Sequence, residues 1–151
     1  MIEPIITDIW NETKEDTKLT NIYLGYFNEA DIKDSDYPFV LAYNNTFSDQ
    51  DHKDAVKPGV RYLVDGRINT RFYSDELLTL SAFFPIWRYN FVLETRGYDY
   101  KLEGDDDTPT IDLDLTYMKL INSSIYPDRV IDKAVWCLEF VSEYSLEIKY
   151  S

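Results

Sequence analysis

The chain has one cysteine and one histidine among its 151 residues. The single cysteine, Cys137, excludes an intrachain disulfide and fits a reducing compartment. It stands between Trp136 and Leu138, which predicts a buried structural thiol and not a nucleophile. The single histidine, His52, excludes any metal site that needs two histidines from one chain. Its polar surroundings predict an exposed loop residue, with a lone general base as the alternative.

Glycine and long apolar runs are also scarce. The five glycines form no phosphate-binding loop and no G-x-S-x-G nucleophile motif. No run approaches the 18 apolar residues of a membrane-spanning helix. The opening residues 1–4 carry an acid and no basic stretch, so we expect no secretory signal. These absences predict a chain without enzymatic activity, cofactor or metal site, and one that does not enter a membrane.

Acidic and aromatic residues, by contrast, are abundant. The chain has 28 Asp and Glu against 15 Lys and Arg, a net charge of -13, and 16% aromatic residues. High charge alone favours disorder, but this much aromatic surface favours burial, so we expect a folded chain with an acidic exterior. Such an exterior repels nucleic acids and anionic lipids, so we expect no direct nucleic-acid binding.

The length fits one domain over residues 1–151. Apolar residues at helical spacing predict an amphipathic helix over residues 2–17. Short strands are expected at Asn21–Phe27 and Tyr37–Tyr43, with Pro38 near the start of the second. The polar stretch Asn44–Lys57 reads as a surface loop.

The middle of the chain contains a sequence typical of a tight hairpin. Asp65-Gly66 separates the β-prone runs Val60–Val64 and Arg67–Tyr73, which predicts a two-residue type I′ turn. Ser74 is placed to cap a short helix over Asp75–Phe84 that ends before Pro85, although a strand remains an alternative there.

Alternating apolar residues predict a long hairpin over Trp87–Ile121. The first strand is expected at Trp87–Thr95, and a shift of the alternation at Gly97 indicates a β-bulge. The acidic segment Glu103–Thr110 is expected to form the hairpin tip. In the tail, alternation favours a strand from Leu138 onward, after a helical turn at Asp128–Ala134.

The expected fold is therefore a β-rich α+β domain. It contains an antiparallel sheet or sandwich of about seven strands, the long bulged hairpin, an N-terminal helix and one or two short helices.

Candidate interface residues gather around the hairpin tip. They are three tyrosines and three acids: Tyr98, Tyr100, Asp105, Asp106, Asp107 and Tyr117. A packed hairpin face is the alternative for the tyrosines. The acids lack the spacing of an EF-hand loop, so a solvated tip is favoured over a cation site. The arginines of the middle third pair either with carboxylates of a neighbouring subunit or with acids of the same fold: Arg61, Arg67, Arg71, Arg88 and Arg96.

Several stretches resemble phage tail-terminator and tail-completion proteins. They are the N-terminal amphipathic helix, the step Tyr23-Leu24-Gly25, and the segment from Asp36 to Val40 after an acidic turn. The stretch 97–100 and the strand Leu113–Tyr117 after the acidic run are similar to a strand pair of that family. About a third of the chain is covered, and the strand-like tail 132–151 departs from the family pattern. The resemblance implies a curled sheet or sandwich with a flanking helix, assembled as a ring, and no catalytic residues.

The sequence thus predicts a phage virion protein of the tail or head–tail connection, which forms homo-oligomers and binds other structural proteins. The alternative is a cytoplasmic acidic inhibitor, either a toxin-immunity protein or a nucleic-acid-mimicking anti-defence decoy.

Overall fold

A computed structural model describes residues 21–49, 56–93 and 98–151 of the chain. The helix expected over residues 2–17, the shift at Gly97 and His52 lie outside these residues. The described elements, in chain order, are β1 (Asn21–Leu24), η1 (Glu29–Asp31), η2 (Asp34–Asp36), β2 (Phe39–Asp49), β3 (Arg61–Ser74), α2 (Leu77–Leu93), β4 (Tyr98–Leu102), β5 (Ile111–Val130) and β6 (Lys133–Tyr150).

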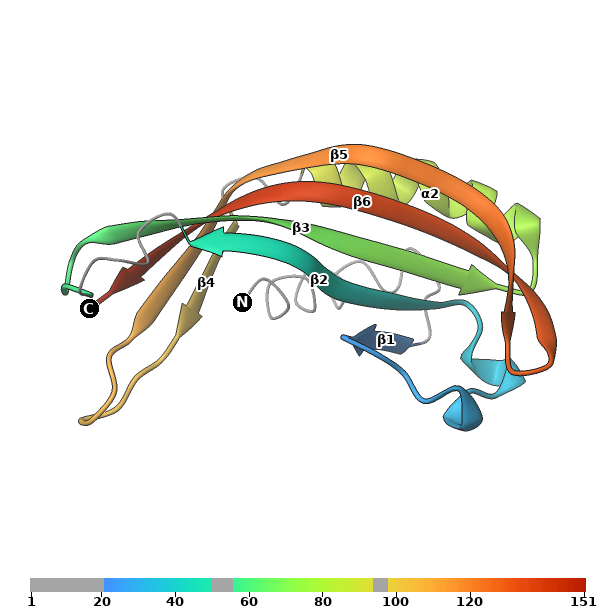
Figure 1. Cartoon of the computed structure of the whole chain (residues 1–151), viewed down its shortest axis with the longest axis horizontal. Coiled ribbons are helices and arrows are strands. Elements are labelled where there is room, and N and C mark those ends of the chain that lie inside the picture. The colour runs from blue at the N-terminus through green and yellow to red at the C-terminus, as the bar shows by residue number, and fades with distance from the viewer. Residues whose placement is uncertain (1–20, 50–55, 94–97) are drawn as a thin grey trace.

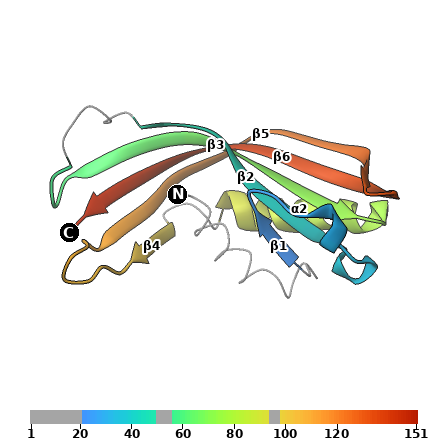
Figure 2. The same cartoon turned by 60° about the horizontal axis from the view of Figure 1, so that its bottom comes forward.

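All described strands belong to one six-stranded sheet with the order β1-β2-β3-β6-β5-β4. β1 is parallel to β2, and every other neighbouring pair is antiparallel. Figure 1 shows β3, β5 and β6 as long arched ribbons, and Figure 2 shows α2 lying across one face of the sheet. We call this the helix face and the other the open face. The β-rich prediction is confirmed, but the described strands number six and form one sheet, not a sandwich.

The sheet is curved because β2 and β5 contain β-bulges, each with an extra residue relative to the partner strand. β3 and β6 pair without a register shift. β5 is shifted against β6 at Leu115/Tyr117 and again at Leu120/Asn122, and β2 is shifted against β3 at Asn44/Thr46. Each bulge bends the strand that holds it, so bulges on both sides of the regular β3–β6 pair arch the sheet.

Apolar residues pack on both faces. On the helix face, alternate residues of β3 and β6, including Phe72, Phe140 and Tyr144, form the main core with Leu80 of α2. At one end of the open face, a second core contains Phe39, Tyr73 and Cys137. Three rings of this second core lie edge-on or stacked on one another: Phe27, Phe39 and Tyr73. None of the described helices is long and apolar enough to cross a membrane.

The hairpin predicted at Asp65-Gly66 is wrong, because both residues lie inside the continuous strand β3. Asp65 pairs with Ser145, and Gly66 pairs with Tyr144. Tyr144 is only 1% exposed, so its pairing with Gly66 belongs to the buried part of the sheet. Asp65 accepts a hydrogen bond from the hydroxyl of its cross-strand partner Ser145.

The strand predicted at Trp87–Thr95 is also wrong, since α2 continues through Pro85 to Leu93. Arg88 is the only charged residue of α2, so apolar residues satisfy the strand period and the helix period equally well. The prediction of a helix at Asp75–Phe84 is confirmed, but its bounds differ: α2 begins at Leu77 and ends at Leu93. Ser74 Oγ accepts a hydrogen bond from the Glu76 amide just before the helix begins.

Two polar segments that were predicted as a loop and as a helical turn contain β-strand. β2 extends through Asp49, so the loop expected at Asn44–Lys57 is wrong for residues 44–49. The helical turn expected at Asp128–Ala134 is wrong, because β5 and β6 meet in a two-residue turn at Ile131 and Asp132. The strand expected from Leu138 is confirmed and begins earlier, at Lys133. Residues 128–130 are strand because they pair with the start of β6, and residues 44–49 are strand because they pair with β3.

Candidate functional site

β4 and the start of β5 form a hairpin that extends from one end of the arched sheet (Figure 1). We call residues 98–115 the acidic arm. Its only base is Lys101, and its acids are Asp99, Glu103, Asp105, Asp106, Asp107, Asp112 and Asp114. The acidic hairpin tip predicted at Glu103–Thr110 is therefore found between two paired strands.

The arm tip is a structured turn. Asp105 Oδ1 accepts hydrogen bonds from the amides of Asp107 and Thr108, each at 2.9 Å, and from the Thr108 hydroxyl at 2.9 Å. The hydrogen bond from the Asp107 amide, followed by those from Thr108, lowers the pKa of Asp105. Gly104 donates its amide to Thr110 Oγ1 at 3.1 Å. The turn holds Asp106 and Asp107 exposed at the end of the arm.

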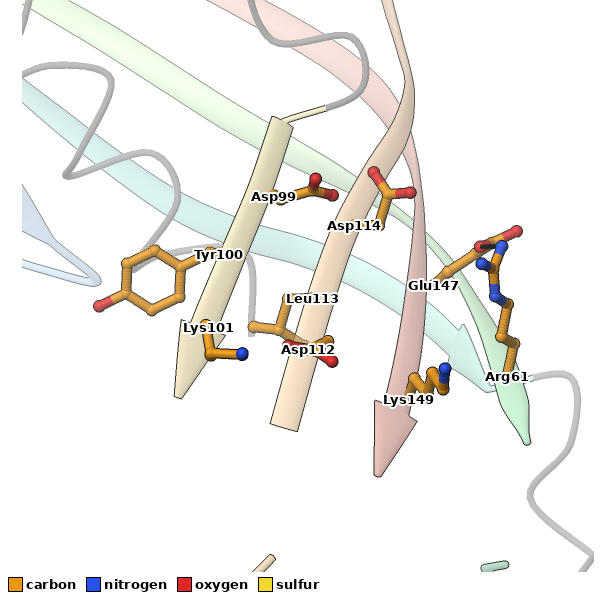
Figure 3. A pocket seen from close by; sticks show the side chains of 9 residues that line it. All are labelled: Arg61, Asp99, Tyr100, Lys101, Asp112, Leu113, Asp114, Glu147 and Lys149. Carbon is orange, nitrogen blue, oxygen red and sulfur yellow. Dashed lines mark hydrogen bonds and ion pairs between the residues drawn. The ribbon is translucent and has the colours of Figure 1, made fainter. Parts of the chain in front are cut away.

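A shallow groove of about 420 Å³ lies on the open face where the arm joins the sheet (Figure 3). Its charged lining residues come from four neighbouring strands: Arg61, Asp99, Lys101, Asp112, Asp114, Glu147 and Lys149. Side chains of one strand alternate between faces, so these residues share the open face because their strands are in register.

Three carboxyl groups form a row across this groove. Asp99 pairs with Asp114, and Asp114 pairs with Glu147, in the strand register. Burial, then the Asp99 carboxylate beside it, raises the pKa of Asp114, whereas Arg61 lowers it. The Oδ1 atom of Asp114 is buried and has no hydrogen-bond partner among the described residues. Asp114 therefore holds its proton to higher pH than an isolated aspartate.

The next row of the groove alternates in sign. Lys101 pairs with Asp112, and Asp112 pairs with Lys149. Figure 3 shows these three side chains beside the carboxyl row. Opposite charges directly across a sheet stabilise the strand pairing, so this row offsets part of the repulsion in the first. In the part of the chain that the structure describes, no three metal-ligating side chains converge.

A ladder of ion pairs continues the open face along β3 and β6. Arg61 binds Glu147 at 3.0 Å, Arg67 binds Glu143 at 3.3 Å, and Arg71 binds Glu139. The predicted alternative of pairing within the fold is thus the one found for these three arginines. Arg88 is exposed on α2, and Arg96 lies outside the described residues. Two sequence signals anticipate the ladder: Arg67 and Arg71 are four residues apart, as are their partners.

The predicted interface residues do not form one patch. Tyr100 is half-buried and packs against the main core on the helix face. Tyr117 pairs with Ser145 on the open face and is 37% exposed. Tyr98 begins β4 opposite Leu115. Asp105, Asp106 and Asp107 are exposed at the arm tip, away from the position of Tyr117 along β5.

Cys137 is buried in the second core, as predicted. Burial raises the pKa of its thiol to about 11, which leaves almost no thiolate at neutral pH. The β5–β6 turn beside this core is held by Lys133. Its ammonium group binds Asp34 at 2.8 Å and lies 4.6 Å from the centre of the Tyr37 ring.

No family model matches this sequence, and no curated protein matches it. What the chain does must therefore be inferred from its own residues and fold.

Proposed function

We propose that the chain is a structural, non-enzymatic protein of a tailed-phage virion, located in the tail or at the head–tail connection and assembled as a ring of identical copies. The observation that supports this proposal is the unpaired negative charge of the acidic arm. Three acids of the open face, Glu139, Glu143 and Glu147, each bind an arginine. The acids of the arm tip make no ion pair with any described residue.

Unpaired charge at the end of a rigid hairpin suits a surface that faces a passing polyanion. An anionic lining keeps DNA from adhering to the wall of a conduit, because like charges repel at short range. Asp105 fixes the tip through its hydrogen bonds, which leaves Asp106 and Asp107 to face solvent. The arched sheet with free strand edges suits assembly through strand addition between copies.

The first test is assembly of the purified chain. Light scattering with size-exclusion chromatography at micromolar concentration should give a mass several times that of one 17.8 kDa copy. Negative-stain images should show rings, and the chain should co-sediment with tail or portal proteins from the same phage. A chain that stays monomeric both alone and beside such proteins contradicts the proposal.

The second test addresses the acidic arm. A Glu103→Gln, Asp106→Asn, Asp107→Asn variant removes tip charges and keeps Asp105, which builds the turn. The variant should assemble like the unmodified chain but bind duplex DNA measurably at low salt, where the unmodified chain should not. Equal DNA binding by both proteins would show that the arm does not repel DNA.

A second candidate function rests on the same arm. An acidic inhibitor, either an immunity protein or an anti-defence decoy, would place these carboxylates in the basic nucleic-acid site of its target. This candidate predicts a monomer that binds a basic nuclease tightly at low salt. Its affinity should fall steeply as ions screen the charges, and an affinity unchanged by salt would exclude this mode of binding.

A further inference from the structure

The acids are absent from two segments that lie together in the fold. None of the 28 acidic residues falls within α2 or within residues 115–127 of β5. The only charged residues of these segments are the bases Arg88 and Lys119. The two segments together carry a charge of +2, so the remaining parts of the chain carry -15.

The two segments are in contact on the helix face. α2 contacts β3, β5 and β6 on the helix face, and Figure 2 shows it lying across that face. Their exposed apolar residues define what we call the acid-free surface: Leu78, Ala82, Pro85, Ile121 and Ile125. Leu78 is 84% exposed, and Ile121 and Ile125 are 43% and 44% exposed. Large apolar side chains with this exposure on contacting elements are typical of an interaction site.

The same side includes a free strand edge. β4 covers only residues 111–115 of β5, while β6 pairs with β5 along its length. Beyond Leu115, no described strand pairs with the other edge of β5. The backbone groups there are available for pairing with a strand of another molecule.

The charge distribution indicates the occupant. Two copies, each with a charge of -13, repel one another over most of their surfaces. The acid-free surface is where another acidic copy is repelled least. Arg88 of α2 is exposed there, whereas Lys119 pairs with Glu143 on the open face and does not belong to this surface. The acidic arm lies at the opposite end of the long axis from the start of α2 (Figure 1). A contact centred on α2 therefore leaves the acidic arms in solvent, where their carboxylates stay hydrated.

We propose that the acid-free surface, formed by α2 and the free edge of β5, binds a second copy of this chain. This inference rests on the self-assembly part of the proposed function. It does not depend on the virion role.

Leu78 gives the sharpest test because its exposed side chain contributes little to the core of one copy. Leu78→Glu places an acid on the acid-free surface, and Leu78→Lys places a base at the same position. Val56→Glu is the matched control, since Val56 is 58% exposed and lies outside this surface. Circular dichroism should show the same fold for all three variants, and sedimentation velocity over a concentration series gives their association constants.

We expect Leu78→Glu to weaken self-association by about tenfold or more through repulsion of the acidic copy. Leu78→Lys should weaken it much less, and Val56→Glu should leave it unchanged. Equal association by Leu78→Glu and Val56→Glu would overturn the inference and leave ring formation standing on another surface. A monomeric unmodified chain would overturn both the inference and the ring. Normal association without binding to tail proteins would contradict only the virion role.

Discussion

Ile131 adopts a backbone conformation that a β-branched residue rarely tolerates. It has a φ of 57° at the first position of the two-residue turn between β5 and β6. Its amide donates a hydrogen bond to Glu29 Oε2 at 3.2 Å, so the turn is tied to η1. The strain at this position is about 1–2 kcal/mol for a residue with a branched Cβ.

Replacing Ile131 with asparagine should therefore stabilise the fold. Asn tolerates positive φ, and the Ile131 side chain is half exposed, so Ile131→Asn should raise the free energy of unfolding by about 1 kcal/mol. Ile131→Val keeps the branched Cβ and should give no gain. Urea denaturation measures both, and an equal gain from valine would show that backbone strain is not the cause.

Asp114 and Asp105 should shift stability in opposite directions with pH. The raised pKa of Asp114 means that the folded chain holds this proton more tightly than the unfolded chain. Stability is then lost as pH rises from the ordinary aspartate value of 3.8 through the raised pKa. Besides Asp99, the charged groups facing it are Glu147 and Arg61.

Asp114→Asn should accordingly stabilise the chain at pH 7, and the gain should vanish below the ordinary value of 3.8. Asp105 has a lowered pKa, so its stabilisation is present at neutral pH and disappears as pH falls through that lowered value. Asp105→Asn keeps an acceptor but loses the charge, so it should destabilise the chain at pH 7. Urea denaturation at pH 7 and at pH values near 3 measures both, and two changes of the same sign would contradict the assignment.

At the scale of elements, the arm turn depends on Gly104. A Cβ atom there would lie 2.2 Å from the Thr108 carbonyl oxygen and 2.5 Å from the Pro109 carbonyl carbon. Both are backbone atoms, so the turn itself must open to admit the side chain. Gly104→Ala should therefore destabilise the arm by about 1–3 kcal/mol.

Hydrogen exchange locates this effect. Amides of the β4–β5 pairing should exchange faster in Gly104→Ala, while those of the β3–β6 pairing should keep their protection. Asp106→Ala is the control, because this exposed residue neighbours the same turn without building it. Equal exchange in the two variants would mean that the turn accommodates a Cβ without opening.

The sequence predicts an element correctly where the spacing of its apolar residues fits only one kind of secondary structure. β6 alternates apolar and polar residues over many positions, which only a strand satisfies, and its identity is predicted correctly. α2 is apolar on every side, so its pattern does not discriminate, and its second half is misassigned. Asp65-Gly66 is a strong turn signal locally, yet long-range pairing with β6 overrides it. The carboxyl row of the groove depends on strand register, which no local pattern contains.

At the scale of the whole molecule, charge is segregated along the chain and in space. The arm concentrates acids at one end, the Arg–Glu ladder neutralises the open face, and the acid-free surface occupies the side formed by α2 and β5. The sequence reveals the acid count and the acidic tip. The acid-free surface follows only once α2 and β5 are known to lie together, because its two segments are separated by the arm in sequence.

This segregation predicts how salt affects the chain. Copies with a charge of -13 repel over distances beyond contact, and ions shorten that repulsion to about 8 Å at physiological ionic strength. The proposed contact is mainly apolar, so salt does not weaken it. Raising sodium chloride from about 20 to 300 mM should therefore strengthen self-association, as measured by sedimentation velocity. Binding to a basic target by the inhibitor mechanism should weaken over the same range. Self-association that falls with salt would mean that ion pairs between copies hold the assembly, and that the apolar contact at α2 and β5 is not its main interface.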